Sequence, residues 1–140
     1  MIPPVLIDTG VIVALLDRSE RRHADCVRAI GGLGAAMVTC EAVIAEACYL
    51  LRSVPGAPAA VLSNVEKGTF QVAFRLAEHA AGVATLLNRY ADQPMDLADA
   101  CLVELADLLG TPRILTLDGD FRTYRWRRRR AFELLVEPGT

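Results

Sequence analysis

The sequence predicts an α/β fold, an α/β/α sandwich around a short and mainly parallel central sheet. Short runs of branched apolar residues at 5–7, 37–39 and 114–117 have the length and composition of strands that are buried on both faces. Longer stretches with an apolar residue every three or four positions separate these runs, as in residues 97–108. Strands that alternate with helices are typical of a parallel sheet with helices on its faces.

The first predicted strand is also the clearest. Residues 5–7 are continuously apolar and end at Asp8, and residues 9–10 are expected to turn the chain. Two further segments carry a weaker signal. Residues 70–74 alternate like a strand, and residues 132–136 are expected to form a closing edge strand.

Helical periodicity covers most of the remaining chain. The clearest helix follows Pro94, which cannot extend a preceding helix, and Asp96 is a favourable residue to cap its start. A loop is expected at residues 53–58, which contain two prolines and a glycine. The predicted helices occupy residues 11–16, 19–30, 43–51, 59–67, 78–90 and 96–109.

Length and composition predict one domain that spans residues 1–140, since 53% of the residues are hydrophobic and can build a core. Residues 1–4 lack the basic region of a secretory signal, and no apolar run approaches the roughly 20 residues of a membrane helix. We therefore expect a cytoplasmic protein with no membrane contact. The cysteines have apolar neighbours and no C-x-x-C pair, which favours buried free thiols at Cys26, Cys40, Cys48 and Cys101.

Carboxylates stand where several predicted elements begin or end. Asp8 follows the first strand and Asp118 follows a late one, so both are expected at the edge where the carboxyl ends of parallel strands meet. Asp96 and Asp99 are three residues apart at the start of a helix and therefore share a face. Glu46 lies inside an apolar helical stripe and joins the other acids if its helix crosses that edge.

The chemistry of this acidic set depends on its members acting together. Taken alone, Asp96 and Asp99 are explained as a helix cap and a favourable first-turn charge. Together the acids offer oxygen ligands without His or Cys, which selects Mg²⁺ or Mn²⁺ over zinc. One or two such ions suit the hydrolysis of a phosphodiester. The only histidines, His23 and His79, lie outside the acidic segments.

Four short motifs occur in an order that points to a known family. They are V-L-I-D-T at residues 5–9, A-V-I-A-E-A at 42–47, M-D-L-A-D-A at 95–100 and L-T-L-D-G-D-F at 115–121. In these motifs the chain resembles the PIN-domain ribonucleases, and specifically the VapC toxins of bacterial toxin–antitoxin pairs. The resemblance covers essentially the whole chain. It implies a PIN-like fold, a metal-dependent endoribonuclease that cuts RNA, a homodimer, and inhibition by a VapB-type antitoxin.

The resemblance also implies roles for single residues. Its acidic quartet matches Asp8, Glu46, Asp99 and Asp118. Metal ligation, by Mg²⁺ with Mn²⁺ as a substitute, is expected at Asp8, Asp99 and Asp118, while Glu46 completes the site or orients water. Auxiliary positions are Asp96, Asp120 and Thr116, the last matching a hydroxyl residue often found before the final acid. Many relatives have Asn where this chain has Gly10, so one side-chain hydrogen bond near the site is absent.

A basic segment follows the last motif. We call its six arginines the arginine strip: Arg122, Arg125, Arg127, Arg128, Arg129 and Arg130. The segment contains no acid, so the rest of the chain carries −8 against a net charge of −2 for the whole. The strip is either a solvated edge or a contact for RNA or for an acidic antitoxin tail. Tyr124 and Trp126 favour RNA, because exposed rings stack on unpaired bases.

Two other functions remain open from the sequence. The first is a catalytically silent PIN-like module that binds RNA or protein, although all four positions of the quartet are acidic. The second is a dimeric aspartic protease, since the triplet Asp8-Thr9-Gly10 also resembles the active-site triplet of that class. Those proteases are built from strands, whereas this chain is mainly of helical period, and the protease leaves Asp99 and Asp118 without a role.

Overall fold

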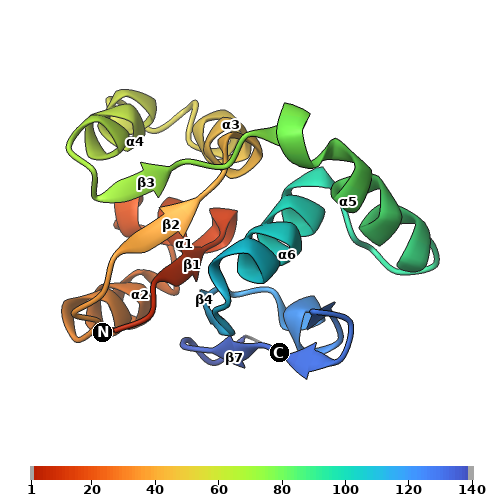
Figure 1. The fold of residues 1–140 in the computed structure, drawn as a ribbon. Coiled ribbons are helices and arrows are strands. Elements are labelled where there is room, and N and C mark those ends of the chain that lie inside the picture. Colours follow the sequence, from red (N-terminus) through yellow and green to blue (C-terminus); the bar gives the residue numbers. More distant parts are fainter. Residues whose placement is uncertain (1, 139–140) are drawn as a thin grey trace.

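A parallel sheet of five strands forms the centre of the computed structural model, which describes residues 2–138 (Figure 1). The strand order is β3-β2-β1-β4-β7, and every neighbouring pair is parallel. The predicted α/β class with a mainly parallel sheet is therefore confirmed. The strands are β1 (Val5–Ile7), β2 (Met37–Thr39), β3 (Phe70–Val72), β4 (Arg113–Leu115) and β7 (Glu133–Leu134).

Strand β1 lies in the middle of the sheet, which explains its uninterrupted apolar sequence. Val5, Leu6 and Ile7 are fully buried. Leu6 is paired with Val38 of β2 on one side and with Ile114 of β4 on the other. A central strand of a parallel sheet is covered on both faces, so each of its positions has to be apolar.

Within the described residues, six α-helices pack in two groups (Figure 1). Helices α1 to α4 contact one another, α5 packs against α6, and α6 also contacts α3. No helix within residues 2–138 is long and apolar enough to cross a membrane. The helices are α1 (Thr9–Leu16), α2 (His23–Gly31), α3 (Glu41–Leu50), α4 (Ala57–Glu66), α5 (Leu76–Arg89) and α6 (Leu97–Leu109).

The arginine strip folds into a small hairpin that the sequence did not predict. A 3₁₀ turn, η1 (Gly119–Arg122), leads into β5 (Arg125–Trp126), which pairs antiparallel with β6 (Arg130–Ala131). Positive φ angles at Arg127 and Arg128 close the hairpin. Tyr124 and Trp126 are buried beneath it, so the expectation that these rings are exposed is wrong. Their large apolar surface is better removed from water against α6 than left free.

Several boundaries also differ from the prediction. Thr9 and Gly10 begin α1 instead of forming a turn, because the Asp8 side chain caps the helix. Helix α2 starts only at His23. The Asp17 carboxylate accepts hydrogen bonds from the backbone and the hydroxyl of Ser19, which holds residues 17–19 in a local turn before the helix can begin.

The four cysteines are free thiols, as predicted. Cys26, Cys40 and Cys101 are buried in the core, whereas Cys48 is half-buried. They act as small apolar residues in the packing of the helices.

Candidate metal centre

Three carboxylates meet at the carboxyl edge of the central strands. Asp8 follows β1, Asp118 lies three residues beyond the end of β4, and Asp99 lies in the first turn of α6. One oxygen atom from each carboxylate lies within 4.8 Å of the corresponding atoms of the other two. The fold thus brings together three side chains that the sequence separates by up to 110 positions.

Asp8 is fixed by two hydrogen bonds at the start of α1. Its Oδ1 atom accepts from the Thr9 backbone N–H at 2.7 Å, and its Oδ2 atom accepts from the Thr116 hydroxyl at 2.7 Å. The side chain is buried. The triplet Asp8-Thr9-Gly10 therefore opens a helix packed on a parallel sheet, which is not the strand-built setting of an aspartic protease.

Asp96 and Asp99 cap the start of α6 reciprocally. Asp96 Oδ1 accepts from the Asp99 backbone N–H at 2.9 Å, and Asp99 Oδ2 accepts from the Asp96 backbone N–H at 3.3 Å. This capping box confirms the prediction that Asp96 is the N-cap residue of the helix. The Tyr124 hydroxyl donates to the same Asp99 Oδ2 atom at 3.4 Å. The Asp99 Oδ1 atom receives no hydrogen bond from residues 2–138, so it is available to a ligand.

Asp118 is held by the backbone of the η1 turn and by Thr116. Its Oδ1 atom accepts from the Asp120 backbone N–H at 2.9 Å, and its own N–H donates to the Thr116 hydroxyl oxygen at 3.0 Å. Thr116 is fully buried and contacts two of the three acids. Asp120 lies beside Asp118 and does not line the hollow described next.

An open hollow of about 330 Å³ lies over the three carboxylates. Helix α3 contributes Glu46 and Leu50 to its wall, and Asp96 contributes from the start of α6. Glu46 is exposed and lies outside the group of three close carboxylates. No lining residue is basic; the wall is formed by Asp8, Thr9, Gly10, Glu46, Leu50, Pro94, Asp96, Asp99, Leu117 and Asp118.

Burial and mutual repulsion raise the pKa of all three carboxyls. Burial raises the pKa of Asp8 to about 6, although the hydrogen bonds from Thr116 and Thr9 act in the opposite direction. The pKa of Asp99 rises to about 8, mainly through burial and then through the neighbouring charges of Asp96 and Asp8. Burial, followed by the charge of Asp120, raises the pKa of Asp118. Three ionised carboxylates therefore need a compensating positive charge in this site.

A divalent cation fits these observations. The three carboxylates of Asp8, Asp99 and Asp118 offer oxygen ligands only, the donor type that Mg²⁺ and Mn²⁺ prefer. No basic side chain in the wall of the hollow competes for the charge. Thr9 is another residue of the wall, and its hydroxyl is buried without a hydrogen-bond partner within residues 2–138.

Two members of the arginine strip, Arg127 and Arg130, lie at the far end of α6 from the acids. The Arg127 backbone N–H donates to Asp107 Oδ1 at 2.5 Å, and its guanidinium donates to the Asp107 carbonyl at 3.2 Å. Asp107 follows Asp99 by eight residues, which is about 12 Å along the helix axis. The Arg127 and Arg130 guanidinium groups lie over the Trp126 ring at 5.3 and 5.2 Å. These arginines are thus not adjacent to the metal centre.

Two more arginines of the strip have partners within the protein. The Arg125 guanidinium donates to three backbone carbonyls, those of Arg122, Thr123 and Tyr124. Arg122 forms an exposed ion pair with Glu137 at 2.6 Å. The side chains of Arg128 and Arg129, by contrast, are exposed and form no hydrogen bond or ion pair within residues 2–138. We therefore divide the strip into four engaged and two open members.

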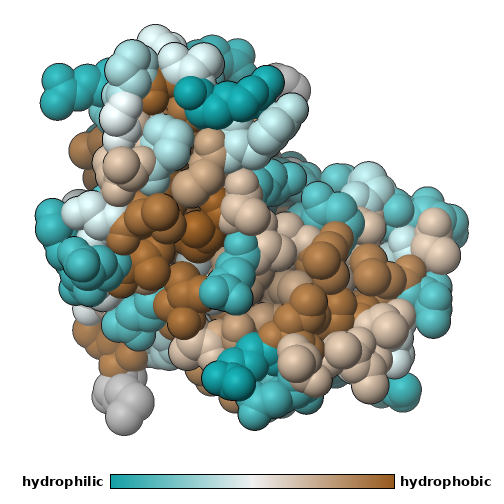
Figure 2. Space-filling model, turned by 90° about the horizontal axis from the view of Figure 1, so that it is seen from above, coloured by the Kyte–Doolittle hydropathy of each residue, from teal (hydrophilic) through white to brown (hydrophobic). Residues whose placement is uncertain are grey.

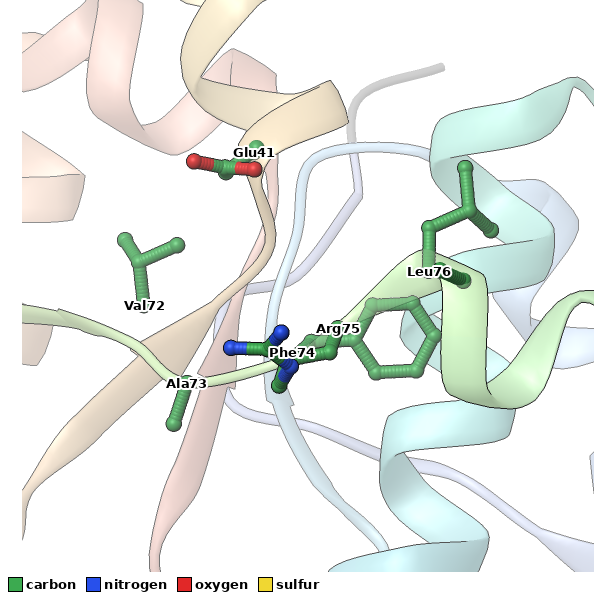
Figure 3. A pocket seen from close by; sticks show the side chains of 7 residues that line it. Glu41, Val72, Ala73, Phe74, Arg75 and Leu76 are labelled. Carbon is green, nitrogen blue, oxygen red and sulfur yellow. The ribbon is translucent and has the colours of Figure 1, made fainter.

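A larger hollow of about 490 Å³ lies at the connection from β3 to α5 (Figure 3). Figure 3 shows Glu41, from the start of α3, facing this connection, with Val72 and Arg75 nearby. The wall contains one acid and one base, and none of the predicted site residues. The larger hollow is therefore separate from the candidate metal centre.

The contact between Tyr124 and Asp99 could not have been foreseen from the sequence. The two residues are 25 positions apart, and Tyr124 lies within the arginine strip, whose composition suggests an exposed segment. Thr9 was also missed as a wall residue, because it was expected in a turn. No local pattern marks either residue.

Known proteins share both the sequence pattern and the fold. The PIN domain family matches residues 5–127. Ribonuclease VapC26 of Mycobacterium tuberculosis (strain H37Rv) is 35% identical over 116 residues, which is 81% of this chain and 86% of VapC26. The crystal structure of M. tuberculosis VapC20, a sarcin-ricin loop cleaving toxin, has the same fold, with a TM-score of 0.78 and 21% identity over 85% of this chain and 93% of VapC20. The chain therefore belongs to the PIN-domain family and, within it, to the VapC-type ribonucleases.

Proposed function

We propose that this protein is a metal-dependent endoribonuclease and the toxin of a type II toxin–antitoxin pair. The observation that carries the proposal is the group of three carboxylates within 4.8 Å of one another, in a hollow without basic residues, in a chain of the VapC type. Mg²⁺ is the proposed ion, with Mn²⁺ as a substitute, since both accept carboxylate and water oxygens.

Asp8, Asp99 and Asp118 would hold the ion. A bound divalent cation lowers the pKa of its water and neutralises charge that builds up on the phosphate. The protein contributes the orientation of the ligands. Thr116 and the Thr9 N–H fix the Asp8 carboxylate, and the capping box fixes Asp99. Such partners of metal ligands orient them and tune their affinity.

Glu46 is proposed to orient the attacking water or to accept its proton. It lines the hollow from α3 but is not one of the three close carboxylates, which suits a role toward water more than direct ligation of the ion. Asp96 and Asp120 are proposed as auxiliary residues. Their hydrogen bonds hold Asp99 and Asp118 in place.

A VapB-type antitoxin and a second copy of this chain are the proposed protein partners. Support comes from apolar side chains on the face above α3, α4 and α5, which gather in two groups in Figure 2. Exposed leucines on these helices and at the start of α6 are Leu50, Leu62, Leu76 and Leu97. Apolar groups of this kind mark protein contacts. The protein is proposed to act in the cytoplasm, where its RNA substrates and its antitoxin are made.

The open members of the arginine strip, Arg128 and Arg129, are the proposed contacts of the strip with RNA or with an acidic antitoxin segment. Exposed guanidinium groups bind phosphates and carboxylates through two parallel hydrogen bonds. Arg122, Arg125, Arg127 and Arg130 contribute to the positive potential, but their guanidinium groups already have partners in the fold.

The first test is cleavage of a pool of structured RNAs by the purified protein with Mg²⁺, with Mn²⁺ or with EDTA. Asp99→Asn is the inactive variant, and Asp92→Asn, in the exposed connection between α5 and α6, is the matched control. Cleavage that needs metal and is lost only in Asp99→Asn supports the proposal. RNA that binds but stays intact with every metal would favour the silent RNA-binding module instead.

A further inference from the structure

Tyr49 is an exposed aromatic side chain that lies one helical turn after Glu46, a residue in the wall of the acidic hollow. Among the phenylalanine, tyrosine and tryptophan residues of positions 2–138, it alone is exposed, with 62% of its surface accessible. The rings expected to stack on RNA, Tyr124 and Trp126, are buried instead. The structure therefore offers one aromatic face to a ligand, and it lies in the last turn of α3.

The position of Tyr49 on the helix places it next to the metal centre. Glu46 and Leu50 both line the acidic hollow, and Tyr49 lies three residues after the first and directly before the second. Residues three apart on a helix are surface neighbours, separated by about 4.5 Å along the axis. Tyr49 thus lies within one helical turn of the wall of the hollow.

Arg52 is held against the Tyr49 ring. Its guanidinium carbon lies 4.0 Å from the ring centroid, and its Nη1 atom donates to the Tyr49 carbonyl at 2.8 Å. The arrangement fixes a cation over an aromatic ring while both side chains remain exposed. Groups that are already ordered lose less conformational entropy when they bind a ligand.

We propose that Tyr49 and Arg52 form a subsite for one unpaired nucleotide of the RNA beside the phosphate that is cut. The proposal rests on the ribonuclease function given above. The base stacks on the open part of the Tyr49 ring, and the Arg52 guanidinium binds the adjoining phosphate. Aromatic rings and arginines are the groups that hold single-stranded nucleic acids.

The charges of the site explain why such a subsite is needed. The wall of the hollow contains five acids and no base, so the hollow repels a phosphate chain except at the proposed ion. Favourable contacts for the neighbouring nucleotide must therefore lie outside this wall. Arg52 supplies a positive charge there, and Tyr49 supplies stacking that does not depend on charge.

The test is binding of a short unstructured RNA, in Mg²⁺, by protein that carries Asp99→Asn so that the RNA stays intact. Adding Tyr49→Ala should weaken binding by about 5- to 150-fold, the range for the loss of one stacked base, whereas Tyr49→Phe should stay within about twofold of the parent. Arg52→Gln should lower the salt dependence of binding by about one phosphate contact. Arg28→Gln is the control. Arg28 lies in the last turn of α2, before the start of β2, so its replacement removes an equal charge and should change neither RNA affinity nor its salt dependence.

Two results would overturn the subsite. One is equal RNA affinity for Tyr49→Ala and Tyr49→Phe while the parent enzyme with Asp99 still cuts RNA. The other is a change from dimer to monomer in sedimentation of Tyr49→Ala that accounts for all of its loss of binding, since Tyr49 would then be a contact between copies. A parent that neither binds nor cuts RNA would instead contradict the proposed function itself.

Discussion

The Thr116 hydroxyl connects two acids of the candidate metal centre. It donates to Asp8 Oδ2 at 2.7 Å and accepts from the backbone N–H of Asp118 at 3.0 Å. Asp8 and Thr116 are 108 residues apart and follow the neighbouring strands β1 and β4. One buried hydroxyl thus fixes both the carboxylate of the first acid and the backbone of the last.

Thr116→Val should weaken metal binding. Valine has nearly the same shape as threonine but cannot donate a hydrogen bond to Asp8. Because the loss of such a partner of a metal ligand lowers metal affinity by about 10- to 100-fold, we expect a loss of that order in Thr116→Val. Thr111→Val is a matched control at the other end of β4. Its buried hydroxyl also makes two hydrogen bonds, to the Pro4 carbonyl and from the Arg113 N–H. A calorimetric titration with Mn²⁺ should separate the variants, and equal affinities would remove Thr116 from the site.

Asp8→Asn and Asp99→Asn should abolish cleavage without unfolding the protein. Each asparagine keeps the shape of the side chain and removes one negative charge from a group of buried carboxylates. Without metal at about pH 8, the free energy of unfolding of Asp99→Asn should therefore rise by about 1 to 3 kcal/mol, because the amide nitrogen can take the place of the free Oδ1 atom. The gain should be smaller in Asp8→Asn, where the amide nitrogen must replace one of two accepting oxygens. Urea denaturation with EDTA measures this gain, and Asp92→Asn should show none. A loss of stability in either site variant would show that its carboxylate has a structural role that asparagine cannot fill.

The stability of the metal-free protein should fall as the pH rises. The ordinary pKa of an aspartic acid is 3.8, whereas the pKa of Asp8 is about 6 and that of Asp99 about 8 in the folded protein. Between about pH 4 and pH 8 the folded state therefore holds protons that the unfolded state has released, and raising the pH favours unfolding. For Asp8 alone, the loss is on the order of 3 kcal/mol.

Metal should reverse this pH dependence. Mg²⁺ binds ionised carboxylates, so its stabilising effect should grow over the same pH range. Thermal unfolding at about pH 5 and about pH 8, with EDTA or with excess Mg²⁺, tests both statements. If the EDTA samples were instead more stable at the higher pH, burial and the neighbouring charges could not be raising the pKa values of these acids in the folded state.

A side chain can be added at Gly10, beside the three carboxylates. It is the second residue of α1 and lines the hollow, and a Cβ atom there would lie 3.7 and 3.8 Å from Leu117 atoms, an ordinary contact. Gly10→Ala should raise the free energy of unfolding by about 0.5 kcal/mol through helix propensity. Gly10→Asn should also add a polar group to the hollow and increase Mn²⁺ affinity. Loss of stability in both variants would show that Leu117 cannot accept the Cβ.

The elements around the metal centre could be predicted because their signals are local. Asp8 and Asp118 follow apolar runs, and the carboxyl ends of parallel strands share one edge. Asp96 and Asp99 have the spacing of a capping box just after Pro94. These features depend on a few adjacent residues, so the sequence is sufficient to place them.

The hairpin at residues 125–131 could not be predicted from the same kind of signal. Its turn needs positive φ angles at Arg127 and Arg128, which arginine seldom adopts and which no glycine or asparagine marks. Packing decides the outcome, because Tyr124 and Trp126 are buried against the rest of the protein. The exposure of Tyr49 likewise depends on how α3 packs in the fold, which its apolar periodicity does not reveal.

The open and engaged arginines of the strip should respond differently to substitution. The double variant Arg128→Gln, Arg129→Gln removes two exposed guanidinium groups that have no partner within residues 2–138. It should weaken RNA binding and lower the slope of affinity against salt by about 1.4, or 0.7 for each contact with single-stranded RNA, without changing stability. Arg125→Gln removes a donor to three carbonyls and should lower the free energy of unfolding by about 1 to 2 kcal/mol. If charge alone mattered, Arg125→Gln would lower the salt slope as much as the loss of one open arginine. A smaller change in slope for Arg125→Gln would show that its partners within the protein keep it from binding RNA. If the double variant kept the parent slope, the strip would be a solvated edge of the hairpin.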